Sequence, residues 1–386
     1  MNELIFQLSL VIIVTAVLSI ILELSKQPIL IAFIFSGLIM GPQGFGLIEN
    51  NLFFEAIGQV GIILLLYLIG LELKTKILGG TFGKGSLITL AASSIIFLVG
   101  LGIGFMTGLG MTEMVYLAVA LIFSSTVVVM KLLNDLKDKN TYVRQYCIAA
   151  LITQDILAIF ILLFISSSRE LGYFGVFQAV KFILQGISIF ALAYVLQRYV
   201  LKPIAKKVLH KPDLMFLLGL AWCFLFAEFA ESLNFSREIG AFIAGISLTF
   251  LPDYKLKIIV QKSETIRDFF MILFFFVLGA NIEFQHLQGY APLIAIALIF
   301  VVIGKPLIFK LFFNVFKAVP NASLEVSTRL GQLSEFSVIL ILLGTSLGHI
   351  SMDFAMSIQV IMFLSIIIST YFVQYVPFYK FRKDED

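Results

Sequence analysis

Charged residues are scarce in this chain: Asp, Glu, Lys and Arg together make up only 13% of its 386 residues. A soluble domain carries roughly 25%, so the composition excludes an ordinary soluble fold. The net charge of +3 says little as a total. Its distribution along the chain is the informative part.

Histidine, cysteine and tryptophan are also rare, with three, two and one residues. Three histidines argue against a His-rich metal site. Cys147 and Cys223 lack the spacing of metal or redox motifs, so we expect two small buried residues. The same composition argues against a soluble enzyme core, and we expect no enzymatic activity, no cofactor and no nucleic-acid partner.

Long apolar runs fill the rest of the sequence, with 60% hydrophobic residues and a mean hydropathy of +1.04. Runs of about 20 apolar residues predict membrane-spanning helices. We therefore expect an all-α polytopic membrane protein in which residues 1–386 form a single transmembrane domain in the lipid bilayer. The thirteen predicted spans are 3–24, 28–48, 52–72, 86–108, 112–134, 142–168, 174–198, 213–233, 236–251, 268–284, 290–316, 323–348 and 353–378.

The basic residues orient these spans. With the N-terminus outside, 22 of the 27 Lys and Arg residues fall in cytoplasmic turns, and only Arg169, Lys181 and Arg237 fall toward the other side. The positive-inside rule therefore predicts an outside N-terminus and a cytoplasmic C-terminus. We expect the plasma membrane as the location, with residues 379–386 as a short charged cytoplasmic tail.

A repeat recurs 209 positions along the chain. Ala32-Phe33-Ile34 returns as Ala241-Phe242-Ile243, Gly70 corresponds to Gly279, and Ser125 corresponds to Ser334. The second predicted span then matches the ninth, and this odd shift inverts the second copy in the membrane. Inverted repeats are typical of secondary transporters. Here they would cover about 28–198 and 236–378.

Two polar stretches fall in mid-span at equivalent places in the repeats: Ser124-Ser125-Thr126, and Ser334-Glu335 with Ser337. Hydroxyl groups can replace backbone hydrogen bonds where a helix breaks, and freed carbonyls can face a cation. Neither stretch contains Gly or Pro. Two interpretations therefore stay open: discontinuous helices, or continuous helices whose Ser and Thr bond back to the preceding turn.

Asp155, which follows Gln154 in a long apolar run, is the strongest functional signal. An ionisable group at this depth costs at least about 2.5 kcal/mol, so a chain that keeps one usually binds an ion or relays a proton with it. At about 1.5 Å per helical residue, Asp155, Thr126, Glu335 and Lys305 all lie near mid-depth and could share one site. A buried structural hydrogen-bonding role for Asp155 is the alternative.

The other buried charges have structural alternatives as well. Lys305 could neutralise Glu335 or Asp155 rather than take part in transport. Glu335 could pair with Arg329, six residues earlier in the chain. For Arg329 itself we favour a structural ion pair.

Five motifs in order give the chain a family resemblance. They are Ile69-Gly70-Leu71-Glu72, Ser124-Ser125-Thr126, Gln154-Asp155, Gly240-Ala241-Phe242-Ile243-Ala244-Gly245 and Arg329-Leu330-Gly331-Gln332-Leu333-Ser334-Glu335-Phe336. Together they resemble the cation:proton antiporter-2 family of monovalent cation/proton antiporters. The glutamine before the aspartate is similar to Kef-type potassium/proton systems, whereas electrogenic sodium/proton members carry two aspartates there.

The resemblance implies a fold and a set of roles. The fold would contain an inverted repeat, a core domain with two crossing discontinuous helices, and a separate dimerisation domain in a homodimer. Asp155 would carry the ion and the proton, Ser125 and Thr126 would belong to one crossing, and Ser334 to Ser337 to the other. We expect no nucleotide-binding regulatory domain of the Kef type.

The chemistry of one carboxylate explains how such exchange could work. Hydrocarbon surroundings favour protonated Asp155 and a bound cation favours the carboxylate, so proton and cation compete. Oxygen atoms of Asp155, Gln154, Thr126 and the backbone suit Na⁺ or K⁺, between which the sequence does not choose. If only neutral forms cross the membrane, exchange is electroneutral; a proton released by Lys305 would change that. A cation channel and an organic-anion symporter on a related fold are the rival functions.

Overall fold

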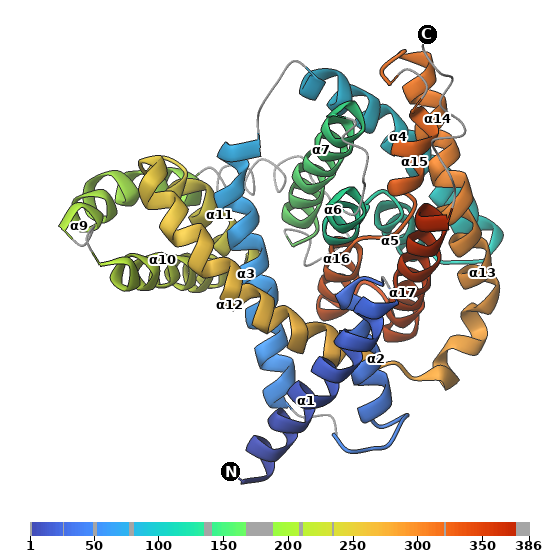
Figure 1. Cartoon of the computed structure of the whole chain (residues 1–386), viewed down its shortest axis with the longest axis horizontal. Helices are drawn as coiled ribbons and strands as arrows, with labels where there is room; N and C mark the ends of the chain where they lie inside the picture. The colour runs from blue at the N-terminus through green and yellow to red at the C-terminus, as the bar shows by residue number, and fades with distance from the viewer. Residues whose placement is uncertain are drawn as a thin grey trace. The chain divides into compact units, whose positions relative to one another are not determined.

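The computed structural model describes residues 2–25, 27–48, 52–76, 81–134, 141–166, 188–207, 211–233, 235–319 and 322–375. These residues are almost entirely helical and contain no β-strand (Figure 1). The prediction of an all-α architecture is therefore confirmed.

The helices of the first half follow the predicted spans closely. They are α1 (Asn2–Leu24), α2 (Ile29–Met40), α3 (Leu52–Lys76), α4 (Thr81–Met106), α5 (Met111–Ala120), α6 (Thr126–Asn134) and α7 (Thr141–Ser166). Most of the predicted span 174–198 lies outside the described residues, as does the tail 379–386.

The second half has the same character. It contains η1 (Gln197–Leu201), α9 (Lys202–Lys207), α10 (Pro212–Ser232), α11 (Arg237–Leu248), α12 (Asp253–Ala280), η2 (Phe284–Tyr290), α13 (Ala291–Ile299), η3 (Phe300–Gly304), α14 (Lys305–Val315), α15 (Ser323–Arg329), α16 (Glu335–Ser346) and α17 (Met352–Tyr375).

Two boundaries differ from the prediction for clear reasons. Helix α2 ends at Met40, eight residues before the predicted span does, because Gly41 adopts an extended conformation (ψ −179°) before Pro42, where the α region is disfavoured. Helix α12 begins at Asp253, 15 residues before the predicted span 268–284. The prediction followed the apolar run alone, whereas the helix also includes the polar turns that precede it.

Several of the described helices are long enough and apolar enough to cross a membrane. Six are long and apolar enough: Leu4–Leu24, Phe82–Met106, Tyr142–Leu162, Pro212–Ser232, Leu287–Val315 and Met352–Val373. Four shorter apolar segments are Ile29–Met40, Ala56–Leu71, Met111–Ala120 and Glu335–Ser346. Short and interrupted spans are typical of transporter cores.

The chain divides into two compact units. Unit 1 comprises residues 1–49, 79–160 and 278–386, and unit 2 comprises residues 50–78 and 161–277. Both units therefore draw on both predicted repeats. The residue ranges of those repeats stay a prediction.

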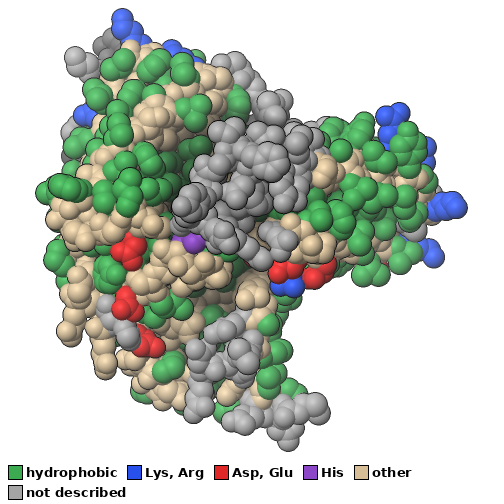
Figure 2. Space-filling view, turned by 180° about the vertical axis from the view of Figure 1, so that it is seen from behind, with side chains coloured by type: hydrophobic (Ala, Val, Ile, Leu, Met, Phe, Trp, Pro, Cys, Tyr) green, Lys and Arg blue, Asp and Glu red, His purple; other side chains and the backbone are tan. Residues whose placement is uncertain are grey.

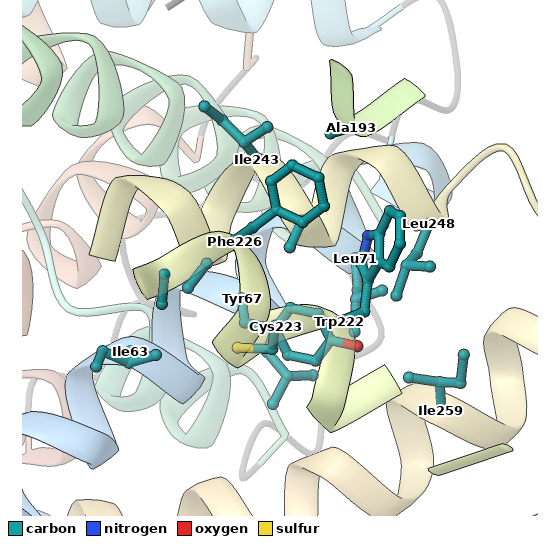
Figure 3. Close-up of a cluster of buried hydrophobic side chains, with 14 of the residues drawn as sticks. Ile63, Tyr67, Leu71, Ala193, Trp222, Cys223, Phe226, Ile243, Leu248 and Ile259 are labelled. Carbon is teal, nitrogen blue, oxygen red and sulfur yellow. The ribbon is translucent and has the colours of Figure 1, made fainter. Parts of the chain in front are cut away.

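Unit 2 is held by a cluster of buried side chains from α3, α10 and α11 (Figure 3). Tyr67 is fully buried, and its hydroxyl donates to the carbonyl of Gly219 at 3.0 Å. The indole nitrogen of Trp222 donates to Ser247 Oγ at 2.9 Å. Both polar ends of these large side chains are thus satisfied inside an apolar cluster, as burial requires.

Glycines allow close helix contacts in both units. In unit 2, a Cβ atom on Gly70 of α3 would lie 2.5 Å from the carbonyl oxygen of Phe242 in α11. In unit 1, Gly279 of α12 lies against the carbonyl of Ile34 in α2. The repeat offset relates Gly70 to Gly279, and each packs on the helix that contains the repeated Ala-Phe-Ile sequence. The second contact therefore repeats the first.

Two π-helical segments precede prolines. Gln197–Leu201 leads into Lys202-Pro203, and Phe300–Gly304 leads into Lys305-Pro306. Proline has no N–H and clashes with the carbonyl four residues earlier, so the wider π turn accommodates it without ending the helix. The second π-helical segment ends at Gly304, directly before Lys305.

We predict that Gly70→Ala lowers stability, because backbone atoms of α11 would have to move to admit the methyl group. A strained small-to-large change in a packed core costs about 1–3 kcal/mol. Gly102→Ala in α4 is the matched control, because nothing lies within 4 Å of its added Cβ. Thermal unfolding in detergent should show a lower midpoint for Gly70→Ala only; equal midpoints would contradict the close contact.

Candidate functional site

Both polar stretches interrupt their helices, which confirms the discontinuous interpretation. Helix α5 ends at Ala120 and α6 begins at Thr126, whereas α15 ends at Arg329 and α16 begins at Glu335. Each end and each start in the second pair lies 209 positions after its counterpart. We call Leu121–Ser125 the first crossing and Leu330–Ser334 the second crossing.

Two serines restart the helices after the crossings. Ser125 Oγ accepts a hydrogen bond from the Val128 amide at 3.3 Å, and Ser334 Oγ accepts one from the Phe336 amide at 3.2 Å. Serine is a favoured N-cap because its oxygen pairs an N–H that has no partner within the helix. These caps explain how both helices restart directly after the two crossings.

The two crossings are bonded to each other and to the opposite half-helices. Ser124 Oγ donates to the carbonyl of Leu330 at 2.9 Å, which joins the first crossing to the second. Ser337 Oγ on α16 donates to the carbonyl of Ala120 at the end of α5, at 2.7 Å. The crossings thus supply hydrogen bonds that water cannot supply in a bilayer.

Lys305 lies with its ammonium between the crossings. The side chain is fully buried, and Nζ donates to the carbonyl of Phe123 at 2.7 Å and to the carbonyl of Gln332 at 3.1 Å. Phe123 and Gln332 are also related by the offset of 209, so Lys305 bridges equivalent carbonyls of the two crossings. A positive charge is favourable there because both carbonyls follow the C-terminal ends of half-helices.

Glu335 provides the opposite charge at the helix starts. Its carboxylate accepts a hydrogen bond from Ser334 Oγ at 3.1 Å. It is also bonded by the Ser125 side chain, the Val127 amide in the first turn of α6, and its own amide at the start of α16. The N-terminal ends of both half-helices therefore share one carboxylate, a favourable position for negative charge.

The ion pair of Arg329 is with Glu325, one turn earlier on α15. Arg329 Nη2 lies 3.1 Å from Glu325 Oε1, and Nη1 donates to the Glu325 carbonyl at 2.8 Å. Arg329 is fully buried and Glu325 nearly so. This partner differs from Glu335, the partner that the sequence alone suggested, because a spacing of four residues places Glu325 on the same helix face.

Gln154 connects α7 to the first crossing with both ends of its amide. Its Oε1 accepts from the Ser124 amide at 3.0 Å, and its Nε2 donates to the Ile122 carbonyl at 2.9 Å. The side chain is 1% exposed. Gln154 therefore holds the crossing, and its Oε1, the side-chain atom that could bind a cation, already accepts a hydrogen bond from Ser124.

Asp155 follows Gln154 on α7 and is 6% exposed. Thr126 begins α6, and among the described residues its buried Oγ1 has no hydrogen-bond partner. Thr126 directly follows the first crossing, and Asp155 directly follows Gln154, the residue on α7 that bonds this crossing. The oxygen atoms of these two side chains are hard donors, which suit a monovalent cation.

Sequence reasoning assigned no role to three polar residues that bond at the second crossing: Gln332 within it, and Ser365 and Ser369 on α17. Ser365 on α17 accepts from the Leu333 amide at 3.0 Å, and Ser369 donates to Gln332 Oε1 at 3.1 Å. Leu333 is the repeat counterpart of Ser124, so Ser365 bonds the second crossing where Gln154 bonds the first. Gln332 lies within the motif Arg329–Phe336, so the sequence offered a signal for it, whereas no sequence pattern relates Ser365 to Gln154.

We predict that Gln154→Glu destabilises unit 1 increasingly as the pH rises. A protonated Glu can still donate to Ile122 as the amide does, whereas a carboxylate leaves that buried carbonyl unpaired, at a cost of about 1–3 kcal/mol. The unfolding midpoint in detergent should therefore fall more at pH 9 than at pH 5. Gln145→Glu, an exposed site on the same helix, is the control; equal effects in both variants would refute the role of Gln154.

Comparison with known proteins agrees with this geometry. The family profile described as "Sodium/hydrogen exchanger, transmembrane" matches residues 10–376. K(+) efflux antiporter 4 of Arabidopsis thaliana is 26% identical over 326 residues, which are 82% of this chain and 54% of that protein. The chain thus spans about half the length of the plant antiporters that it matches.

Other relatives match over nearly their full length. Na(+)/H(+)-K(+) antiporter GerN of Bacillus cereus is 25% identical over 377 residues, 97% of this chain and 96% of that protein. The solved structure of the sodium proton antiporter MjNhaP1 from Methanocaldococcus jannaschii has a TM-score of 0.70, with 17% identity and 96% of each chain covered, and therefore has the same fold. By the match of residues 10–376, the chain belongs to the transmembrane sodium/hydrogen exchanger family.

Proposed function

We propose that this integral membrane protein is a secondary-active antiporter that exchanges Na⁺ or K⁺ for H⁺ by alternating access. The observation that carries the proposal is Asp155, a buried carboxylate beside the residue that holds the first crossing. The similarity to a K(+) efflux antiporter and to a Na(+)/H(+)-K(+) antiporter supports the same substrates.

The roles of the site residues follow from their contacts. Asp155 binds the cation or the proton, and Thr126 Oγ1 is available as a second oxygen ligand. Gln154 and Ser125 position the crossing and the start of α6. Ser334, Glu335 and Lys305 neutralise the half-helix ends, and Arg329 stabilises α15 through Glu325.

Lys305 supports an electroneutral exchange. Its two partners are backbone carbonyls, which accept hydrogen bonds and hold no proton to release. If Lys305 keeps its proton throughout the cycle, it stays a fixed positive charge beside the two carbonyls, and only Asp155 changes its charge. One proton is then exchanged for one cation, because hydrocarbon favours the neutral forms of the carrier.

The proposal also covers the membrane, the oligomeric state and the orientation of the protein. We place it in the plasma membrane as a homodimer, with its N-terminus outside, its C-terminus in the cytoplasm and no resident cofactor. The asymmetric distribution of Lys and Arg supports this orientation. The two inverted repeats, about 28–198 and 236–378, supply one crossing each.

Transport by purified protein in acid-loaded liposomes tests the proposal. Adding Na⁺ or K⁺ outside should raise the lumenal pH, and Asp155→Asn should reduce the rate to that of protein-free liposomes while the protein stays folded. Asp213→Asn, whose side chain is 92% exposed in the native chain, is the control and should transport normally. Full activity in Asp155→Asn would overturn the site.

An imposed membrane potential tests the stoichiometry in the same liposomes. In electroneutral exchange, net proton movement stops when the cation ratio across the membrane equals the proton ratio. The outside cation concentration at this null point does not depend on the membrane potential. It should therefore stay constant at potentials of either sign. A null point that moves with the potential would contradict exchange of one proton for one cation.

A further inference from the structure

Five basic side chains gather in unit 2 around α9: Arg198, Lys202, Lys206, Lys207 and Lys211, which we call the basic segment. The sequence contains no Asp or Glu from residue 171 to residue 212. Blue side chains stand at the end of unit 2 that α9 forms (Figures 1 and 2). The segment therefore carries concentrated positive charge without internal neutralisation.

The helix geometry turns this charge outward. Leu201 and Ala205 are 2% and 0% exposed and belong to the buried cluster of unit 2. Arg198, Lys202 and Lys206 follow one another at intervals of four residues, which places them along one stripe beside the buried pair. Arg198, Lys206, Lys207 and Lys211 are exposed, and Lys202 is half-buried.

Exposed apolar residues alternate with these charges. Tyr199, Val200 and Ile204 are 70%, 46% and 41% exposed. The Arg198 guanidinium lies 5.9 Å from the centre of the Tyr199 ring. A helical segment that presents both Lys or Arg and large apolar side chains is typical of the boundary between headgroups and acyl chains.

The neighbouring span fixes the depth of the segment. Helix α10 begins at Pro212, directly after Lys211, and Pro212–Ser232 is apolar and long enough to cross the bilayer. The basic segment is therefore at the bilayer surface. Asp213, the acidic residue next to it, is paired with Lys262, and within the described residues none of the five basic side chains forms an ion pair.

We propose that the basic segment is a docking surface for anionic phospholipid headgroups of the surrounding bilayer. The ammonium and guanidinium groups would bind headgroup phosphates, while Tyr199, Val200 and Ile204 contact the acyl chains. Each Lys or Arg near an anionic membrane surface contributes about fivefold in affinity. This docking is independent of the chemistry at Asp155.

The test uses the full chain in detergent, titrated with phosphatidylglycerol, with phosphatidylcholine or with inorganic phosphate. Phosphatidylglycerol should raise the unfolding midpoint and remain bound in native mass spectrometry, whereas phosphatidylcholine and phosphate should do neither. The variant Lys202→Gln/Lys206→Gln/Lys207→Gln should need at least about tenfold more phosphatidylglycerol for the same shift, with an unchanged midpoint in phosphatidylcholine.

A matched control removes three basic groups of unit 1, Arg144→Gln/Lys310→Gln/Lys317→Gln, and should respond to phosphatidylglycerol like the native chain. Equal loss of response in both triple variants would overturn the proposal, because net charge rather than the basic segment would then account for lipid binding. An equal shift with inorganic phosphate would also overturn it, because the surface would then bind a free anion. A triple variant that unfolds in phosphatidylcholine is replaced by Lys206→Gln alone, whose response should fall about fivefold.

Discussion

The structure depends on how two interrupted helices satisfy their backbone inside a bilayer. In hydrocarbon an unpaired N–H or C=O group costs several kcal/mol, and each crossing exposes several. Lys305 donates to equivalent carbonyls of the two crossings, and Glu335 accepts from the starts of the two half-helices. Lys305 and Glu335 thus each bond to both interrupted helices, and each lies beside helix ends whose partial charge favours the charged form of its side chain.

In the proposed mechanism, the residues that support the crossings differ from the residue that carries the ion. The charges that stabilise the crossings have partners fixed by hydrogen bonds, so they need not change when an ion binds. Gln154 extends the support to α7, because its amide bonds the first crossing with both ends. In the proposed mechanism, Asp155, the residue after Gln154, is the carboxylate that exchanges proton and cation. The same reasoning explains why a glutamine at position 154 suits a site with one exchanging carboxylate.

Much of this could be predicted from the sequence, because hydrocarbon imposes simple rules. Apolar length gave the helices, and the 209-residue offset related Ser125 to Ser334, which are now seen as equivalent N-caps. The partners of the charges could not be predicted. Lys305 binds backbone carbonyls, which no side-chain pattern reveals, and Arg329 binds Glu325 rather than Glu335. Ser365 takes the place of Gln154 in the second half, a substitution that only the fold makes visible.

The central claim is that one carboxylate, Asp155, binds proton and cation in turn. Calorimetric titration of the detergent-solubilised protein with Na⁺ or K⁺, in buffers of different ionisation enthalpy, counts the protons released for each cation bound. The account predicts close to one proton per cation near neutral pH, and no cation binding by Asp155→Asn. Cation binding without proton release, or the release of two protons, would contradict it.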